Sequence, residues 1–293
     1  MAINSISAEL LLLCRQFQPK AADFLMLGRQ WLRLSVNQAA KLSQDHQIKL
    51  EDLADPQFSD TVYAEPLLRR MNFQRVESLD ATAYQGAGLV HDLNVPLSAD
   101  LHEQWDWVFD GGSLEHVFDF PAAIRNCSSL LRPGGMFITM CPVNNWMGHG
   151  FYQFSPELFF RAFAAEHGFQ VRFATLVSHG PPEMFHALRD PAETGKRVQF
   201  NPPGRLSLLF VAQKNPGARI TEVQQSDYSE RWAQKDETGS VKPANQTSRL
   251  AAVMPSPIRR VLSQWRIKQR RQRENTRGMV KCATLGEAWT MKR

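Results

Sequence analysis

Apolar runs of strand length alternate with amphipathic segments of helix length over the first 215 residues. Runs that are apolar on both faces and end at a turn residue are typical of central strands in a parallel sheet, because helices cover both sides of such a sheet. The first run ends in Gly28, and the second to fourth carry an acidic residue near their carboxyl ends. Five strands are predicted in this way, at residues 22–28, 75–81, 87–94, 105–112 and 134–143.

Helical patterns fill the intervals between these runs. We predict helices at residues 7–18, with Ser7 as N-cap, at 120–131, and at 155–168, with Ser155 as N-cap. Two further β-rich runs, 169–177 and 205–214, follow without a full helix between them, which predicts an antiparallel pair at the edge of the sheet. The predicted fold is therefore α/β: a Rossmann-like, doubly wound, mostly parallel sheet of seven strands within residues 1–215.

The rest of the chain has a different composition. Residues 216–256 are polar and are predicted to be a linker, whereas 257–293 contain eleven Lys or Arg against two Glu, a balance of +9. Since the whole chain carries +5, residues 1–256 carry −4. Residues 256–273 have the pattern of a basic amphipathic helix, so 257–293 are predicted to be a basic tail.

Cysteine spacing and hydropathy exclude several classes. The four cysteines lie far apart, without a CxxC pair or a nearby His at ligand spacing, so the sequence predicts neither a disulfide framework nor a metal site. The longest early apolar stretch, "ELLLLC", is much shorter than a membrane span, and no basic residue precedes it. We therefore expect a cytoplasmic protein without a transmembrane segment.

Three carboxylates stand at the carboxyl ends of successive predicted strands: Asp80, Asp92 and Asp110. In a doubly wound sheet, ligands bind beyond these ends, where the strand order reverses. An acid at the end of the second strand is suited to accept hydrogen bonds from ribose hydroxyls. Taken singly, Asp80 also fits a loop-capping role and Asp92 an Asx turn before Pro96. One acid per strand end favours a shared nucleoside site.

The stretch "WDWVFDGGSLEHVFDFPAAIRNCSSLLRPGGMFI" resembles class I S-adenosylmethionine (SAM) dependent methyltransferases of the type 11 kind. The matching residues are Asp106, Glu115, His116 and the turn 131–135, and the resemblance extends over about residues 20–215. It implies SAM as the cofactor. It assigns Asp80 to the ribose, Asp92 and Leu93 to the adenine, and Asp110 and Gly111 to the methionine end.

Two features depart from that family. Its glycine-rich turn after the first strand is reduced here to Gly28, followed by Arg29 and Gln30. Arg29 is interpreted either as a donor to the SAM carboxylate or as a surface Arg. The interval from Gly28 to Asp80 is also long, so residues 46–73 are interpreted as an insertion that covers the pocket.

The loop "CPVNNWMGHGFYQF" after the fifth strand contains His149 between two glycines. An imidazole there is suited to act as general base on an acceptor hydroxyl, and a structural His is the alternative. His116 is predicted to lie with Glu115 on a helix after the fourth strand, where it either packs or contacts substrate.

These observations predict an enzyme, a SAM-dependent methyltransferase that modifies oxygen or nitrogen of a small molecule or glycan precursor. One alternative is a non-catalytic binding module of the same fold. Another is a protein that binds RNA or an anionic membrane surface through its basic tail, although nucleic acid is the less favoured partner. The absence of GxGxxG argues against an NAD-dependent dehydrogenase. The sequence does not define an oligomeric state.

Overall fold

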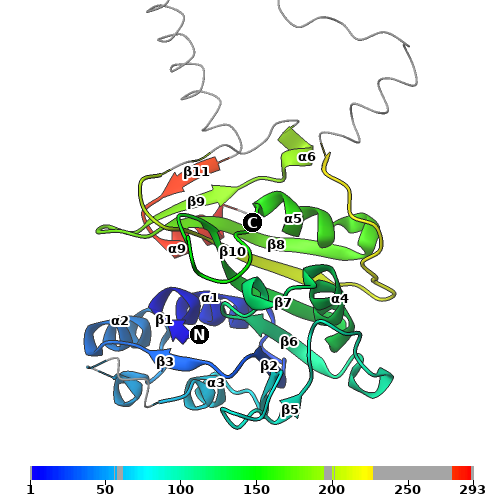
Figure 1. Ribbon diagram of the computed structural model, residues 1–293. Coiled ribbons are helices and arrows are strands. Elements are labelled where there is room, and N and C mark those ends of the chain that lie inside the picture. Colours follow the sequence, from blue (N-terminus) through cyan, green and yellow to red (C-terminus); the bar gives the residue numbers. More distant parts are fainter. Residues whose placement is uncertain are drawn as a thin grey trace, which may run out of the picture.

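The computed structural model describes residues 2–55, 57, 62–194, 200, 202–226 and 279–291. Their main feature is a sheet of nine strands, with helices on both faces (Figure 1). A separate parallel pair, β1 with β3, lies beside it. The strands are β1 (Ala2–Asn4), β2 (Asp23–Leu27), β3 (Trp31–Arg33), β4 (Arg75–Asp80), β5 (Leu89–Val90), β6 (Trp105–Asp110), β7 (Leu131–Asn144), β8 (Phe169–Ser178), β9 (Met184–Leu188), β10 (Leu206–Lys214) and β11 (Met279–Cys282).

The parallel half of the large sheet has the order β5-β4-β2-β6-β7. In chain order these are the third, second, first, fourth and fifth of its strands, which is the doubly wound arrangement that reverses direction between the first and fourth. Strands β2 and β6 are buried on both faces, as their continuous apolar runs predicted. The prediction was less accurate for residues 87–94, where only Leu89–Val90 pair.

The antiparallel half is larger than predicted. The two expected strands exist as β8 and β10, but β10 lies between β7 and β8, and β8 pairs onward with β9. The chain then returns at Met279–Cys282 to add β11 to the edge of β9. The prediction of seven strands with an edge pair is therefore wrong, because two short strands continue the sheet beyond it.

Residues 279–291 had been assigned to a basic tail, yet in the structure they belong to the sheet domain. After β11, the short helix α9 (Leu285–Thr290) places Trp289, which is 5% exposed, against Phe17 and Phe173, at ring-centroid distances of 5.1 and 5.0 Å. The predicted basic helix at 256–273 and most of the predicted linker lie outside the described residues.

Two apolar layers hold the helices to the sheet. Alternate strand residues such as Phe24 and Trp107 face one layer, and Leu25 and Val108 face the other. The first layer also holds side chains of α1 (Ser5–Phe17), α2 (Val36–His46), α3 (Glu65–Arg70) and α9; the second holds those of α4 (Phe120–Leu130) and α5 (Pro156–Ala162) (Figure 1). A further short helix, α6 (Pro191–Thr194), follows β9.

Local helix signals were partly misassigned. Helix α1 is capped by Asn4 rather than by Ser7, which instead completes a capping box at the third helical position. Ser155 occupies the N-cap position of α5, but its side chain makes no capping hydrogen bond. That helix ends at Ala162, and a 3₁₀ turn then leads to Gly168 in the left-handed region.

This difference predicts a contrast between two substitutions. We expect Asn4→Ala to lower the free energy of unfolding by about 1 kcal/mol, because the first turn of α1 loses its side-chain acceptor. Ser155→Ala, which removes a hydroxyl without a capping bond, is expected to change it by less than about 0.5 kcal/mol. Urea unfolding followed by circular dichroism measures both. Equal costs would contradict the assignment of the caps.

Candidate functional site

The order of the sheet reverses between β2 and β6, and the chain leaves β2 at Gly28. Gly28 has φ +68°, and its N–H donates to the Leu79 carbonyl of β4 at 2.8 Å. The Asp80 carbonyl in turn accepts the His91 N–H at 2.9 Å. The carboxyl ends of three neighbouring strands are thus tied together at the edge where doubly wound sheets bind ligands.

A cavity of about 250 Å³ opens at this edge. It brings together four of the predicted cofactor-binding residues and one of the two predicted catalytic histidines. None of its lining residues comes from the described part of the predicted insertion 46–73. The cavity is lined by Gly28, Leu79, Asp80, Ala81, His91, Asp92, Leu93, Asn94, Ser113, His116 and Val117.

The two carboxylates on the wall are held in fixed positions by short-range hydrogen bonds. Asp80 Oδ1 accepts the Ala81 N–H at 2.7 Å. Asp92 Oδ1 accepts from the backbone N–H of Asn94 at 2.9 Å and from its side-chain amide at 2.7 Å. These bonds from Asn94 lower the pKa of Asp92, so that it stays ionised at neutral pH. Among the described residues, the second oxygen of each carboxylate has no hydrogen-bond partner, which leaves both groups able to accept from a ligand.

Asp110 stands at a strand end as predicted, but its carboxylate points into the protein. It is fully buried: Oδ2 accepts from Thr139 Oγ1 at 2.6 Å, and Oδ1 accepts from the N–H groups of Ser113 and Leu114 at 2.8 and 3.2 Å. Burial raises the pKa of Asp110, while these hydrogen bonds favour its ionised form. Asp110 therefore fixes the loop that follows β6 and does not line the cavity.

The neighbouring Gly111 also faces protein. A Cβ at Gly111 would lie 2.6 Å from Gln30 Oε1. The buried Gln30 side chain donates to the carbonyls of Leu27 and Gly28 at 3.0 and 3.2 Å. Gln30 thus occupies the space beside the shortened glycine turn.

Arg29 lies away from the 250 Å³ cavity. It forms an ion pair with Glu65 at 2.6 Å, donates to the Gln85 carbonyl at 2.8 Å and stacks on the Tyr63 ring at 3.7 Å. It lines a different cavity, of about 590 Å³. Two of its partners come from the predicted insertion 46–73, whose described residues therefore engage Arg29.

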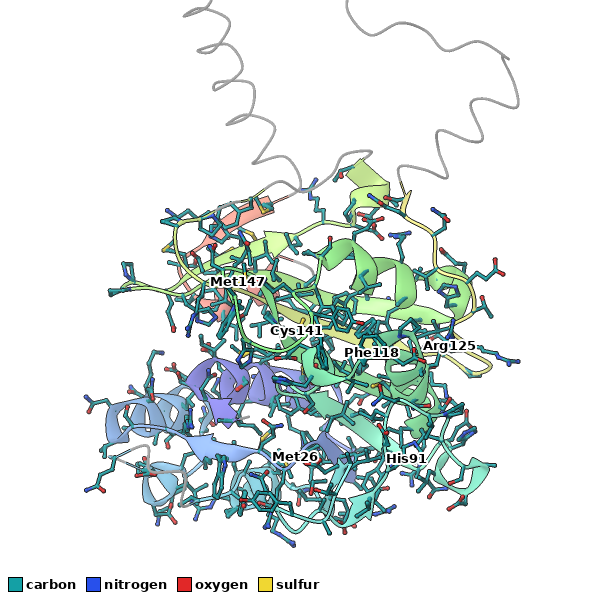
Figure 2. The ribbon with its side chains drawn as sticks, in the orientation of Figure 1. Met26, His91, Phe118, Arg125, Cys141 and Met147 are labelled. Atoms are coloured by element: carbon teal, nitrogen blue, oxygen red, sulfur yellow. The ribbon has the colours of Figure 1, made fainter. Side chains whose placement is uncertain are left out.

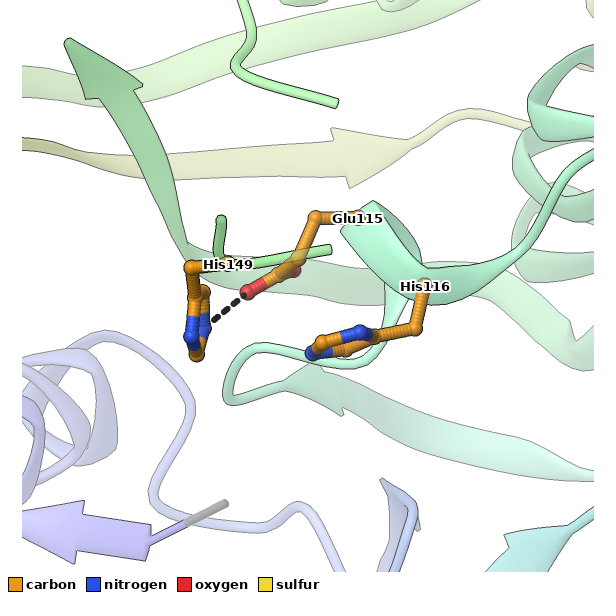
Figure 3. Close-up of side chains that lie close together, drawn as sticks. All are labelled: Glu115, His116 and His149. Atoms are coloured by element: carbon orange, nitrogen blue, oxygen red, sulfur yellow. Dashed lines mark ion pairs between the residues drawn. The ribbon is translucent and has the colours of Figure 1, made fainter. Parts of the chain in front are cut away.

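Three side chains converge beside the cavity: Glu115, His116 and His149 (Figure 3). Glu115 and His116 lie in a 3₁₀ turn, Leu114–His116, and not in the helix that the sequence predicted. The Glu115 carbonyl accepts the N–H groups of Phe151 and Tyr152 at 2.7 and 3.2 Å. These two bonds hold the loop that carries His149 over the turn.

The Glu115 carboxylate is the most perturbed group in the cluster. Its side chain is 1% exposed, Oε2 has no hydrogen-bond partner among the described residues, and Oε1 lies 3.4 Å from His149 Nε2. Burial, and then the charge of Asp110, raise the pKa of Glu115 to about 8. The His116 ring lies 5.2 Å from that of His149, centroid to centroid, and burial followed by the His149 charge lowers its pKa.

Exposed apolar side chains stand on the same loops. Phe118 and Met147, which are labelled in Figure 2, are 72% and 93% exposed, and Phe151 is 67% exposed. Phe118 and Phe151 meet edge to face at 5.9 Å. They follow His116 and His149 in the chain by two residues each, so an apolar surface accompanies the cluster.

Sequence reasoning overlooked Ser113 as a lining residue and gave Glu115 only a packing role. Ser113 had a usable signal, since a hydroxyl residue directly after a strand end and two glycines lies where ligands bind. Glu115 offered none, because its partner His149 is far away in the sequence.

No family model matches the chain, and no curated protein matches it. Among solved structures, it is similar to the Burkholderia thailandensis 1,6-didemethyltoxoflavin-N1-methyltransferase, crystallised with that substrate and S-adenosylhomocysteine: TM-score 0.38, 15% identity, covering 72% of this chain and 78% of that one. An O-methyltransferase from a Brevibacillus brevis polyketide synthase, in complex with S-adenosylhomocysteine, has TM-score 0.36 and 13% identity over 82% and 86% of the chains.

The [4+2]-cyclase SpnF is similar to the same degree, with TM-score 0.38 and 16% identity over 72% of this chain and 82% of that one. Proteins of different named activities thus stand side by side at this level of likeness, which does not carry an activity from one chain to another.

None of the described helices combines the length and the hydropathy that a membrane-spanning helix needs.

Proposed function

We propose that this chain is a SAM-dependent methyltransferase that modifies oxygen or nitrogen of a small molecule or glycan precursor. The observation that carries the proposal is the cavity at the strand reversal, in which Asp80, Asp92 and Gly28 share one wall. Two carboxylates on neighbouring strand ends, each with an oxygen free to accept hydrogen bonds, suit the hydroxyl and amino groups of a nucleoside.

The cavity fits the nucleoside part of SAM better than the whole molecule. At about 250 Å³ it lies just below the usual range of small-molecule sites, about 300–1,000 Å³. In this assignment Asp80 accepts from the ribose hydroxyls, and Asp92 with Leu93 faces the adenine. Gly28 and Ser113 line the way toward the methionine end, whereas Asp110 and Gly111 act only by shaping the loop. Arg29, engaged by Glu65 and Tyr63, has no role in this assignment.

The two histidines supply the acceptor side. SAM, when bound, offers a methyl group on a sulfonium leaving group, so the protein has mainly to position the acceptor and, for a hydroxyl, to remove its proton. His116 lines the cavity and His149 stands next to it, with Glu115 at 3.4 Å to orient the ring. His149 is the proposed general base.

A non-catalytic binding module is the second candidate. The observation in its favour is Gln30, whose buried side chain fills the space beside the shortened glycine turn. Such a module would have lost the cofactor at this turn and would transfer no methyl group. Binding of RNA or an anionic membrane surface through the predicted basic helix at 256–273 concerns residues outside the described part of the chain.

Calorimetric titration of the full chain with SAM tests the proposal. Asp80→Ala removes two hydrogen bonds to an ionised acceptor, about 1.5 kcal/mol or more each, and is expected to weaken SAM binding at least about a hundredfold. Asp119→Ala is the matched control, because this exposed acid caps α4 and does not line the cavity.

Methyl incorporation from labelled SAM into a cell extract then separates the two candidates. Binding with incorporation supports the enzyme, and folded protein that neither binds SAM nor incorporates a methyl group supports the module. No binding of SAM to folded protein would remove the methyltransferase proposal.

A further inference from the structure

The cluster of Glu115, His116 and His149 has the composition of a metal-binding site. Each residue offers one ligand atom, a carboxylate oxygen or a ring nitrogen, and the three atoms lie within 4.8 Å of one another. Two imidazoles with one carboxylate form a ligand set that binds zinc and other divalent transition metals, with coordination positions left open.

The distance between two of the groups fits a shared ion. His149 Nε2 and Glu115 Oε1 are 3.4 Å apart, which is longer than an ordinary N–H···O hydrogen bond. Two ligands bound to one tetrahedral zinc at about 2.1 Å are separated by about 3.4 Å. The observed spacing would allow both atoms to bind one ion, as it also allows the ion pair.

The one ion-pair partner of Glu115 among the described residues is His149, which balances the ionised carboxylate only when its own ring is protonated. The Glu115 side chain is 1% exposed, Oε2 has no partner within the part of the chain that the structure describes, and the nearby Asp110 is a second buried acid. Among the described residues, no Lys or Arg forms an ion pair with Glu115. A divalent cation would supply the balancing positive charge, and buried charges are normally paired or bound to metals.

We propose that Glu115, His116 and His149 bind one divalent cation of the zinc type at the mouth of the 250 Å³ cavity. The sequence predicts no metal site because its cysteines have no nearby His at ligand spacing. These ligands instead come from two loops, at residues 115–116 and 149, which the hydrogen bonds of Phe151 and Tyr152 to the Glu115 carbonyl bring together.

The position of the cluster indicates what the cation does. Both histidines are exposed, so the ion keeps open positions toward solvent and the cavity that His116 lines. A hydroxyl bound there has its pKa lowered, its O–H bond breaks, and the proton passes to water while oxygen keeps the electron pair. In the ion-bound chain both rings are ligands and neither accepts the proton, so the ion takes the place of the general base that His149 supplies in the ion-free chain. This role rests on the proposed function and narrows the acceptor to a compound with a hydroxyl group.

Metal binding by the full, tag-free chain tests the site directly. After removal of metal with a chelator, Co²⁺ is titrated and followed by its visible absorption, and Zn²⁺ is titrated by calorimetry. We expect one ion per chain. His116→Ala and His149→Ala are each expected to weaken binding at least about a hundredfold, since even changes outside the ligand sphere cost about 10- to 100-fold.

His91→Ala is the matched control, because this imidazole lines the same cavity but lies outside the cluster, and its variant is expected to bind as the unchanged chain does. Glu115→Gln keeps the shape of the buried side chain and removes its charge. Weaker metal binding by this variant would support the site, because the loss could not be attributed to unfolding. Circular dichroism checks the fold of each variant. Absence of Co²⁺ and Zn²⁺ binding, or binding that survives loss of both histidines, would overturn the proposal. No SAM is present, so failure of the methyltransferase proposal would leave this result unaffected.

Discussion

Asp110→Ala is expected to lower the free energy of unfolding by about 3 kcal/mol or more. The substitution removes a fully buried acceptor from three donors, the hydroxyl of Thr139 and the N–H groups of Ser113 and Leu114. Each buried donor left without a partner costs about 1–3 kcal/mol. Because two of the three belong to the loop after β6, the loss also loosens the turn that carries Glu115 and His116.

Asp110→Asn is the control for this effect. An amide keeps one oxygen to accept from Ser113 and Leu114, so it should retain most of the stability that alanine loses. Urea unfolding measures the cost, and calorimetry with SAM measures the effect on the neighbouring cavity. If Asp110→Ala were as stable as the unchanged protein but bound SAM much more weakly, Asp110 would be a ligand contact after all, and its proposed role in shaping the loop would be wrong.

The parallel half of the sheet could be predicted because its information is local. Strands β2 and β6 are apolar at nearly every position, and such a run has few alternatives in a domain of this size. Strand β9 follows two prolines and is only five residues long, and β11 carries Lys281 in a segment of basic composition. Both form through pairing with a neighbouring strand, which no local pattern reveals.

The site divides in the same way. Asp80 and Asp92 reach the predicted cavity because their position depends only on where a parallel strand ends. Asp110 has the same sequence pattern, yet Thr139 from β7 binds its carboxylate inside the protein.

Arg29 and His149 were likewise placed by partners that no local pattern reveals. Glu65 and Tyr63 direct Arg29 toward another cavity, and the Glu115 carbonyl directs the loop of His149. Strand ends were predictable from the sequence, whereas the side chains that bind across elements required the structure.

Gly150→Ala is expected to displace His149 from Glu115. Gly150 has φ +73°, and a Cβ there would lie 2.7 Å from the Glu115 carbonyl oxygen, the atom that accepts from Phe151 and Tyr152. The contact is with backbone, so the loop itself has to move. Hydrogen exchange at the amides of Phe151 and Tyr152 is expected to accelerate at least about tenfold, because both lose their acceptor. The rate of methyl transfer depends on the position of His149. It is expected to fall about a hundredfold if the His149 side chain is displaced by about 1 Å.

Gly148→Ala separates this clash from the cost of the backbone conformation. Gly148 lies in the same loop with φ +77°, but a Cβ there has nothing within 4 Å. Both variants bear the strain of a left-handed alanine, about 1–2 kcal/mol, and only Gly150→Ala adds the contact with Glu115. If the amide hydrogens of Phe151 and Tyr152 exchanged equally fast in both variants, backbone strain alone would account for the effect. The loop would then not depend on its close approach to Glu115. Faster amide exchange in Gly150→Ala than in Gly148→Ala would show that the close approach of Gly150 to Glu115 positions the loop of His149. Both the general-base and the cation-bound arrangements require that position of His149.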